Sequence, residues 1–438
     1  MVKPIELARR GAALPARAPL VCRGRVVELT GLSVRASIDG VRHGELVDLE
    51  RPGGEPLPAE VVGFRGDEAV LVPLGETRGL GVGAAVTATG GPFAIRVGRA
   101  LLGRVLDGLG RPIDGRPLPE GLAPWGVDRP APSPLDRPRV AAPLALGVRA
   151  IDALLTAGEG QRIGLFAGSG VGKSSLLGQI ARGTEAEVVV VGLVGERGRE
   201  VRDFVEESLG PAGLARSVVV AATSDAPALV RLKAAHVATA LAEWFAEAEG
   251  KRVLLLLDSV TRFARAQREV GLAAGEPPAR QGYPPSVFAA LPRLLERTGQ
   301  RARGAITAVY TVLVAGGDLD EPVADEVRGI LDGHVVLDRQ LAARGHFPAV
   351  DVLQSVSRVM PAVTGPHHRA LAARARRLLA AHERQRDLIA LGAYRAGSDP
   401  EADEALARLP ALERFLRQEI AEPSTLAGAL AALEEALA

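Results

Sequence analysis

A glycine-rich segment between an apolar run and a predicted helix constrains this chain more than any other feature. Residues 161–166 predict a short buried strand, residues 167–174 read Ala-Gly-Ser-Gly-Val-Gly-Lys-Ser, and a helix is expected to follow. Glycines let the backbone turn its N–H groups inward, and the helix N-terminus adds a partial positive charge. This order of parts predicts a phosphate-binding loop. The residues expected to line it are Ala167, Gly168, Ser169, Gly170, Val171, Gly172, Lys173, Ser174 and Ser175.

Two side chains at the end of this loop carry specific chemistry. Lys173 can reach the β- and γ-phosphates of a nucleotide, and the Ser174 hydroxyl can ligate Mg²⁺. Ala167 stands where the motif usually has its first glycine, but a small residue with negative φ fits the end of a strand. The alternative interpretation is a glycine-rich loop that only joins a strand to a helix.

Composition limits the class of protein. With 438 residues, of which 47% are hydrophobic, the chain can form two or three domains with a substantial core. A formal net charge of +1 argues against a chain built mainly to bind nucleic acid. Cys22 is the only cysteine, so an intrachain disulfide is impossible. Residues 1–20 lack the apolar core of a signal peptide, and no run reaches transmembrane length.

The chain divides into three predicted parts. Residues 1–92 contain short alternating segments separated by glycines, which predict a small β-barrel, and Asp39-Gly40 is a hairpin signal between two of them. Residues 93–362 alternate strand and helix patterns after a proline-rich connection. Residues 363–438 are rich in alanine, leucine and arginine and predict a C-terminal helical domain with helices over 368–393, 400–420 and 425–438.

The central part predicts a parallel sheet covered by helices. Residues 187–194, 217–221 and 252–257 are apolar runs of the kind found in strands buried on both faces. Ligands of such sheets bind at the carboxyl ends of the strands. Asp258 ends one of these runs, where a carboxylate can join a Mg²⁺ shell. The alternative is that Asp258 or Ser259 caps the helix that follows.

A second polar group follows the run that ends at Val194. Hydrolysis needs a group that orients or deprotonates the attacking water, and Glu196 stands at the appropriate end of its strand. Arg197 can contact the γ-phosphate. The alternative is that both residues lie in a solvated loop with ordinary surface ion pairs.

Five further segments resemble a known family. They are Gly-Glu-Arg-Gly-Arg-Glu-Val at 195–201, Asp-Ser-Val-Thr-Arg-Phe-Ala at 258–264, Gly-Tyr-Pro-Pro-Ser-Val-Phe at 282–288, Ile-Leu-Asp-Gly-His at 330–334 and Ser-Val-Ser-Arg-Val-Met at 355–360. Together they resemble the ATPases of type III protein secretion, in the virulence injectisome or the flagellar export apparatus. These ATPases are relatives of the ATP synthase catalytic subunit. The resemblance covers most of the chain and implies a central RecA-like domain.

The resemblance implies roles for particular residues. Glu196 matches the catalytic base, Lys173 and Ser174 match the phosphate and Mg²⁺ contacts, and Asp258 matches the second metal-site carboxylate. Arg358 matches an arginine finger that enters the site of a neighbouring subunit. Without the resemblance, the sequence favours an ordinary surface arginine at position 358, in a chain with 53 lysines and arginines.

Two departures from the family pattern affect further positions. Phe347 matches the aromatic residue that packs on adenine, where the family usually has tyrosine, and it keeps the stacking face. A plain core role for Phe347 stays open. Gly317 stands where the family often has one member of an acidic pair.

The resemblance also implies the biological setting. It implies a homohexamer that hydrolyses ATP with Mg²⁺ at the cytoplasmic face of the inner membrane, as a peripheral protein. Implied partners are chaperone–substrate complexes, a stator or regulator, and a central stalk protein, with no nucleic acid. Residues 272–281 are closer to the injectisome pattern, which favours the injectisome over the flagellum. Alternatives are a non-catalytic nucleotide-binding ring subunit, against which Glu196 argues, and a hexameric nucleic-acid translocase, against which the charge argues.

Overall fold

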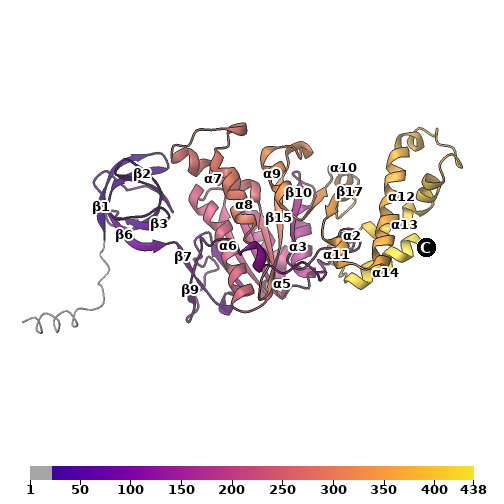
Figure 1. Ribbon diagram of the computed structural model, residues 1–438, viewed down its shortest axis with the longest axis horizontal. Helices are drawn as coiled ribbons and strands as arrows, with labels where there is room; N and C mark the ends of the chain where they lie inside the picture. The colour runs from indigo at the N-terminus through magenta and orange to yellow at the C-terminus, as the bar shows by residue number, and fades with distance from the viewer. Residues whose placement is uncertain (1–21) are drawn as a thin grey trace, which may run out of the picture. The chain divides into compact units, whose positions relative to one another are not determined.

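The computed structural model describes residues 22–438 and divides them into two compact units (Figure 1). One unit contains the chain up to residue 93 together with 270–276, and the other contains 94–269 and 277–438. The prediction that residues 1–20 are not a signal peptide, and the first part of the predicted 1–92 domain, lie outside the described residues. The predicted domain boundaries stay a prediction.

The first unit is a closed six-stranded barrel, as the short alternating segments predicted. Strands such as β2 and β3 alternate buried and more exposed side chains, and the barrel interior is filled by small and branched apolar residues such as Val34, Val47 and Leu71. The barrel order is β1-β2-β5-β4-β3-β6. Its strands are β1 (Arg23–Thr30), β2 (Ser33–Ser37), β3 (Glu45–Leu49), β4 (Leu57–Arg65), β5 (Glu68–Pro73) and β6 (Ala85–Pro92).

The hairpin predicted at Asp39-Gly40 is wrong. Strand β2 pairs with β1 and β5, whereas β3 pairs with β4 and β6, so the strands on either side of this turn are not neighbours. Gly40 does adopt the left-handed conformation that favours glycine, with φ of 77°. The turn is therefore real, but it carries the chain across the barrel because barrel closure gives each flanking strand other partners.

The second unit is built on the predicted parallel sheet, in the order β17-β16-β10-β15-β13-β11-β12-β8. Every pair along this order is parallel except β16–β17, and a short strand, β14 (Gly299–Gln300), pairs antiparallel with β15. The strands are β8 (Arg104–Asp107), β10 (Arg162–Ala167), β11 (Val188–Glu196), β12 (Ser217–Thr223), β13 (Arg252–Asp258), β15 (Ala305–Leu313), β16 (Gly333–Leu337) and β17 (Val350–Ser357). A separate two-stranded sheet joins β7 (Ala94–Val97) and β9 (Ala123–Gly126).

Helices connect and cover these strands. The most buried is α6 (Ala228–Glu247), which packs on β11, β12 and β13 and is apolar on most of its surface. Three helices that follow the carboxyl ends of β10, β11 and β13 are α3 (Lys173–Gly183), α4 (Gly198–Asp203) and α7 (Val260–Ala273). The others before the C-terminal part are α2 (Arg149–Leu154), α5 (Gly210–Ala215), α8 (Pro285–Leu295), α9 (Pro322–Ile330) and α10 (Arg339–Ala343).

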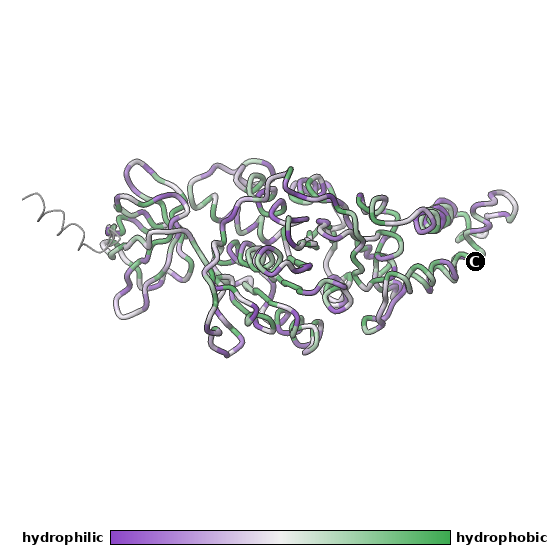
Figure 2. The backbone as a smooth tube through the Cα atoms, turned by 60° about the horizontal axis from the view of Figure 1, so that its bottom comes forward, coloured by the Kyte–Doolittle hydropathy of each residue, from purple (hydrophilic) through white to green (hydrophobic). Residues whose placement is uncertain are grey.

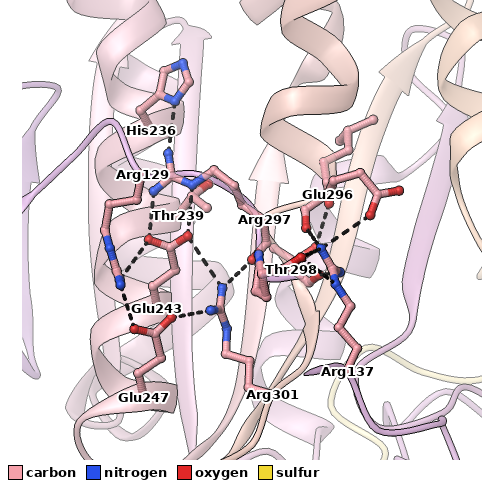
Figure 3. A network of polar contacts seen from close by, with 12 residues as sticks. Arg129, Arg137, His236, Thr239, Glu243, Glu247, Glu296, Arg297, Thr298 and Arg301 are labelled. Carbon is pink, nitrogen blue, oxygen red and sulfur yellow. Dashed lines mark hydrogen bonds and ion pairs between the residues drawn. The ribbon is translucent and has the colours of Figure 1, made fainter. Parts of the chain in front are cut away.

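A buried ion-pair network fixes the far end of α6 (Figure 3). The side chains of Arg297 and Glu243 are 2% and 1% exposed, and they meet through two hydrogen bonds of 2.9 and 2.8 Å. Arg301 and Arg129 form ion pairs with both Glu243 and Glu247. Because a buried charge is costly unless paired, this network ties the end of α6 to the residues on both sides of β14 and to Arg129.

The C-terminal part forms the three predicted long helices, preceded by the short α11 (Met360–Val363). These are α12 (Pro366–Ala390), α13 (Pro400–Leu416) and α14 (Leu426–Leu437). Asp399 caps α13 by accepting hydrogen bonds from the N–H groups of Glu401 and Ala402. Figure 2 shows hydrophobic and hydrophilic stretches alternating along the segment that ends at the C mark, as amphipathic helices require.

These helices share a core with the sheet. Their apolar faces pack on α2 and continue the core cluster that holds the central strands, through residues such as Leu378, Leu412, Phe415 and Leu433. The backbone N–H of Gln418 also donates to the carbonyl of Phe347. The C-terminal helices are therefore packed into the second unit.

Candidate active site

The predicted phosphate loop joins the end of β10 to the start of α3. Gly170 and Gly172 have φ of 77° and 85°, which β-carbon-bearing residues rarely adopt, so glycine is required at both positions. Ala167 is the last residue of β10 and is hydrogen-bonded into the sheet beside β15 and β16, which explains why alanine fits there. Val171 is buried and so anchors the loop to the core.

The loop lines an open pocket of about 600 Å³ at the carboxyl edge of the sheet. All nine residues predicted for the loop border this pocket except Val171, whose side chain points into the core. Glu196, Arg197 and Glu200 border the pocket from the β11 side, and α7 contributes two arginines, Arg262 and Arg265. The pocket thus gathers cations and carboxylates around a loop suited to phosphates.

Three predicted residues meet at the centre of this site. Lys173 forms an ion pair with Asp258, and its Nζ lies 3.8 Å from Oε1 of Glu196. The two carboxylates come from adjacent parallel strands, since Leu193 of β11 pairs with Asp258 of β13. Asp258 Oδ1 also accepts a hydrogen bond of 2.7 Å from the Thr311 hydroxyl, which fixes its orientation.

Glu196 is the last residue of β11 and is 6% exposed. Burial, together with the negative charge of Asp258, raises the pKa of Glu196 to about 7, although Lys173 opposes this shift. A carboxylate with a pKa near neutrality is suited to accept a proton from water. Arg262 holds this carboxylate by hydrogen bonds of 3.1 and 3.3 Å to its two oxygens.

Sequence reasoning missed Arg262 and Arg265 as site residues. Arg262 lies inside the 258–264 segment that resembles the family, and this resemblance could have identified it as a site residue. Arg197, which was predicted, has a side chain that is 76% exposed and pairs with Glu200 at 3.3 Å. It borders the pocket at the mouth of the site.

Phe347 lies beside the loop. It is 43% exposed, and its ring is 3.3 Å from the position that a β-carbon on Gly172 would take. The ring is therefore available to a ligand held by the loop and is not a core side chain. Its contact with adenine stays a prediction.

Arg358 lies away from the loop of its own chain. Its N–H donates to the carbonyl of Asp332, whose own N–H donates to Arg162, the first residue of β10. The loop begins at the other end of that strand, after Ala167, so about 16 Å of strand at ~3.3 Å per residue separates the two. The Arg358 side chain is exposed and makes no hydrogen bond or ion pair within the part of the chain that the structure describes.

The donors present fit Mg²⁺. No group of three or more histidine, cysteine, aspartate or glutamate side chains that could hold a metal ion occurs among residues 22–438. Mg²⁺ in phosphate-transfer sites is held by only one or two protein oxygens, and phosphate and water oxygens complete its shell. Ser174 at the start of α3 and Asp258 at the end of β13 supply one hydroxyl and one carboxylate at the same edge of the sheet.

A phosphate loop, a carboxylate at the end of a neighbouring strand and a buried glutamate with a raised pKa define a P-loop nucleoside triphosphate hydrolase. Three family models match the chain in order. They are the ATP synthase alpha/beta family beta-barrel domain over residues 23–90, the nucleotide-binding domain of the same family over 147–357, and the T3SS EscN ATPase C-terminal domain over 364–435.

Relatives match nearly the whole chain. The flagellum-specific ATP synthase of Bacillus subtilis (strain 168) is 52% identical over 412 residues, which is 94% of each chain. The type 3 secretion system ATPase of Xanthomonas euvesicatoria is 53% identical over 396 residues, or 90% of this chain and 89% of that protein. The assembled ATPase EscN of the enteropathogenic Escherichia coli type III secretion system superposes with a TM-score of 0.90 at 45% identity, covering 95% of this chain and all of that one.

This chain belongs to the type III secretion and flagellar export ATPases of the ATP synthase alpha/beta family. The predicted family, three-part fold and ATPase activity are thereby confirmed. Flagellar and secretion ATPases match it about equally well, so the predicted preference for the injectisome stays a prediction. Within the described residues, no helix is long and apolar enough to cross a membrane.

Proposed function

We propose that this chain hydrolyses ATP to energise protein export through an injectisome, releasing chaperones and unfolding the exported proteins. The observation that carries the hydrolytic part is the meeting of Lys173, Asp258 and buried Glu196 at one edge of the sheet. Residues 272–281 favour the injectisome. The flagellar export apparatus is the second candidate, favoured by the 52% identity to a flagellum-specific relative.

In the proposed mechanism, backbone N–H groups of residues 168–174 and the Lys173 ammonium hold the β- and γ-phosphates. Ser174 and Asp258 would hold Mg²⁺, which would supply positive charge to the phosphate oxygens. Glu196 orients a water molecule and takes its proton as the water oxygen bonds to the γ-phosphorus. The bond from that phosphorus to the oxygen bridging to the β-phosphate breaks, giving ADP and phosphate. Phe347 packs on the adenine ring.

The active form is proposed to be a homohexameric ring. Arg358 is exposed, unpaired within residues 22–438 and near the opposite end of β10 from its own loop, which suits a finger that serves another copy. In that position its guanidinium would stabilise charge on the transferring phosphoryl group. The related EscN has been solved as an assembled ATPase, which supports assembly of this chain.

One of the proposed partners is supported by a related structure. EscN has been solved in complex with its central stalk EscO, and the matching chain of that structure superposes on this chain with a TM-score of 0.88. We infer a central stalk partner here, a stator or regulator, and chaperone–substrate complexes that contact the helices of residues 363–438. The proposed location is the cytoplasmic face of the inner membrane, with no nucleic-acid partner. The proposed domains are residues 1–92, 93–362 and 363–438.

One pair of assays separates these proposals from their alternatives. Purified protein should release phosphate from ATP with Mg²⁺, at a rate that RNA does not change. A protein that binds ATP without hydrolysing it would be a non-catalytic ring subunit, and strong stimulation by RNA would indicate a translocase. Expression in strains that lack either the injectisome ATPase or the flagellar ATPase would then identify the pathway, by which of the two secretion defects is restored.

A further inference from the structure

One cation in the active-site pocket is unpaired within residues 22–438 and has no use in the mechanism above. Four cationic side chains border this pocket, and three of them are already paired. Lys173 pairs with Asp258, Arg262 with Glu196, and Arg197 with Glu200. The fourth, Arg265, forms no hydrogen bond or ion pair with any residue in 22–438.

Helix α7 places Arg265 on the Glu196 side of the pocket. Arg262 and Arg265 are three residues apart on this helix, so they lie on one face of it, one turn apart. Arg262 bonds to Glu196, and Lys173 lies between that glutamate and Asp258. Since a loop lysine reaches the β- and γ-phosphates, the terminal phosphate of a bound nucleotide would lie near Lys173 and Glu196, on the side of the pocket that α7 borders.

Among residues 22–438, the only other unpaired charge that borders the pocket is Glu321, at the N-terminus of α9. It is not within ion-pair distance of Arg265 in the described part of the chain, so no carboxylate neutralises this arginine. An unpaired guanidinium at a phosphate site is suited to form two parallel hydrogen bonds with a phosphate group.

We propose that Arg265 binds the γ-phosphate of ATP and thereby makes the site prefer the triphosphate over the diphosphate. This inference rests on the proposed nucleotide site and deepens it. ADP retains the phosphates held by the loop and Lys173 but lacks the group that Arg265 would contact. Arg265 is therefore expected to contribute to ATP affinity and little to ADP affinity.

The test is nucleotide binding by calorimetry with Mg²⁺ in the full-length E196Q protein, in which ATP should persist during the titration. Adding R265A should weaken ATP binding about tenfold, equivalent to ~1.4 kcal/mol, and leave ADP binding unchanged. R265K, which keeps the charge, should recover part of the loss. R268A is the matched control, because Arg268 is on the same helix but lies over the Tyr283 ring, with 5.6 Å between its guanidinium carbon and the ring centroid.

Three results would overturn the proposal. They are equal losses for ATP and ADP, an unchanged ATP affinity, and a loss that sedimentation shows to accompany failure of the ring to assemble. K173A in the same background separates this proposal from the site itself. If K173A weakens binding of both nucleotides while R265A changes neither, the phosphate loop stands and only the role of Arg265 fails. If K173A leaves both affinities intact, the proposed nucleotide site fails.

Discussion

Two inactive variants, K173A and R358A, should partly restore each other's activity when mixed. The sheet register puts Arg358 level with the start of β10, about 16 Å of strand from the loop at ~3.3 Å per residue, so it cannot serve the site of its own chain. K173A removes the loop cation and keeps the finger, whereas R358A does the reverse. Alone, R358A should lose about a thousandfold or more in turnover, which is the size of the effect that an arginine finger has in related phosphoryl-transfer enzymes.

The size of the rescue follows from counting interfaces. In a randomly mixed ring of equal amounts, a working site forms only where the loop of an R358A chain meets the finger of a K173A chain. Each interface is directional, with one chain supplying the loop and the next supplying the finger. With equal amounts, about half of the loops come from R358A and about half of the fingers from K173A, so about one quarter of the interfaces combine both. The mixture should therefore hydrolyse ATP at about one quarter of the unmutated rate per chain, if the sites turn over independently.

Phosphate release is measured for each variant alone and for the mixture. Mixed rings are first verified by co-purification through an affinity tag on one variant. R377A is a matched control, because Arg377 is exposed on α12 and is also unpaired within residues 22–438, and it should keep the unmutated rate. An R358A protein with normal turnover, or no gain in verified mixed rings, would refute the assignment of Arg358 as a finger acting between chains.

Three further outcomes are expected. K173A should abolish hydrolysis without unfolding the protein, since the lysine lies at an open pocket, and a circular dichroism melt with a phosphate-release assay checks both points. E243A should destabilise the protein by about 3–5 kcal/mol in urea unfolding, because it leaves the buried Arg297 unpaired, whereas E249A, which breaks an exposed pair with Arg99, should cost less than about 1 kcal/mol. Plotted against pH, kcat/KM should fall as the pH drops below about 7, because the raised pKa of Glu196 leaves its working carboxylate form protonated there; a flat profile from pH 6 to 8 would contradict this.

Much of the site could be predicted because its parts follow a local order. The phosphate loop occupies consecutive residues, and Glu196 and Asp258 each end an apolar run. Parallel strands bring such ends to one edge of a sheet, so their proximity follows from the strand pattern. The position of Arg358 away from its own loop was implied by the family resemblance and not by any local pattern.

What could not be predicted depends on contacts between distant segments. Arg262 reaches Glu196 across 66 residues of sequence, and Arg297 pairs with Glu243 across 54. Neither pairing has a signature in the spacing of charged residues, because it depends on how a helix docks beside a strand or a turn. The hairpin at Asp39-Gly40 failed for the same reason, since closure of the barrel decided which strands pair.

The most direct test of this account is turnover and ATP binding by the E196Q protein. The amide keeps the shape of the glutamate and loses the proton acceptor, so the variant should bind ATP with the affinity of the unmutated protein and release no phosphate above background. Measured in one preparation, retained binding with lost hydrolysis would support Glu196 as the base. Hydrolysis by E196Q at the unmutated rate would contradict the account, because another group would then have to activate the water.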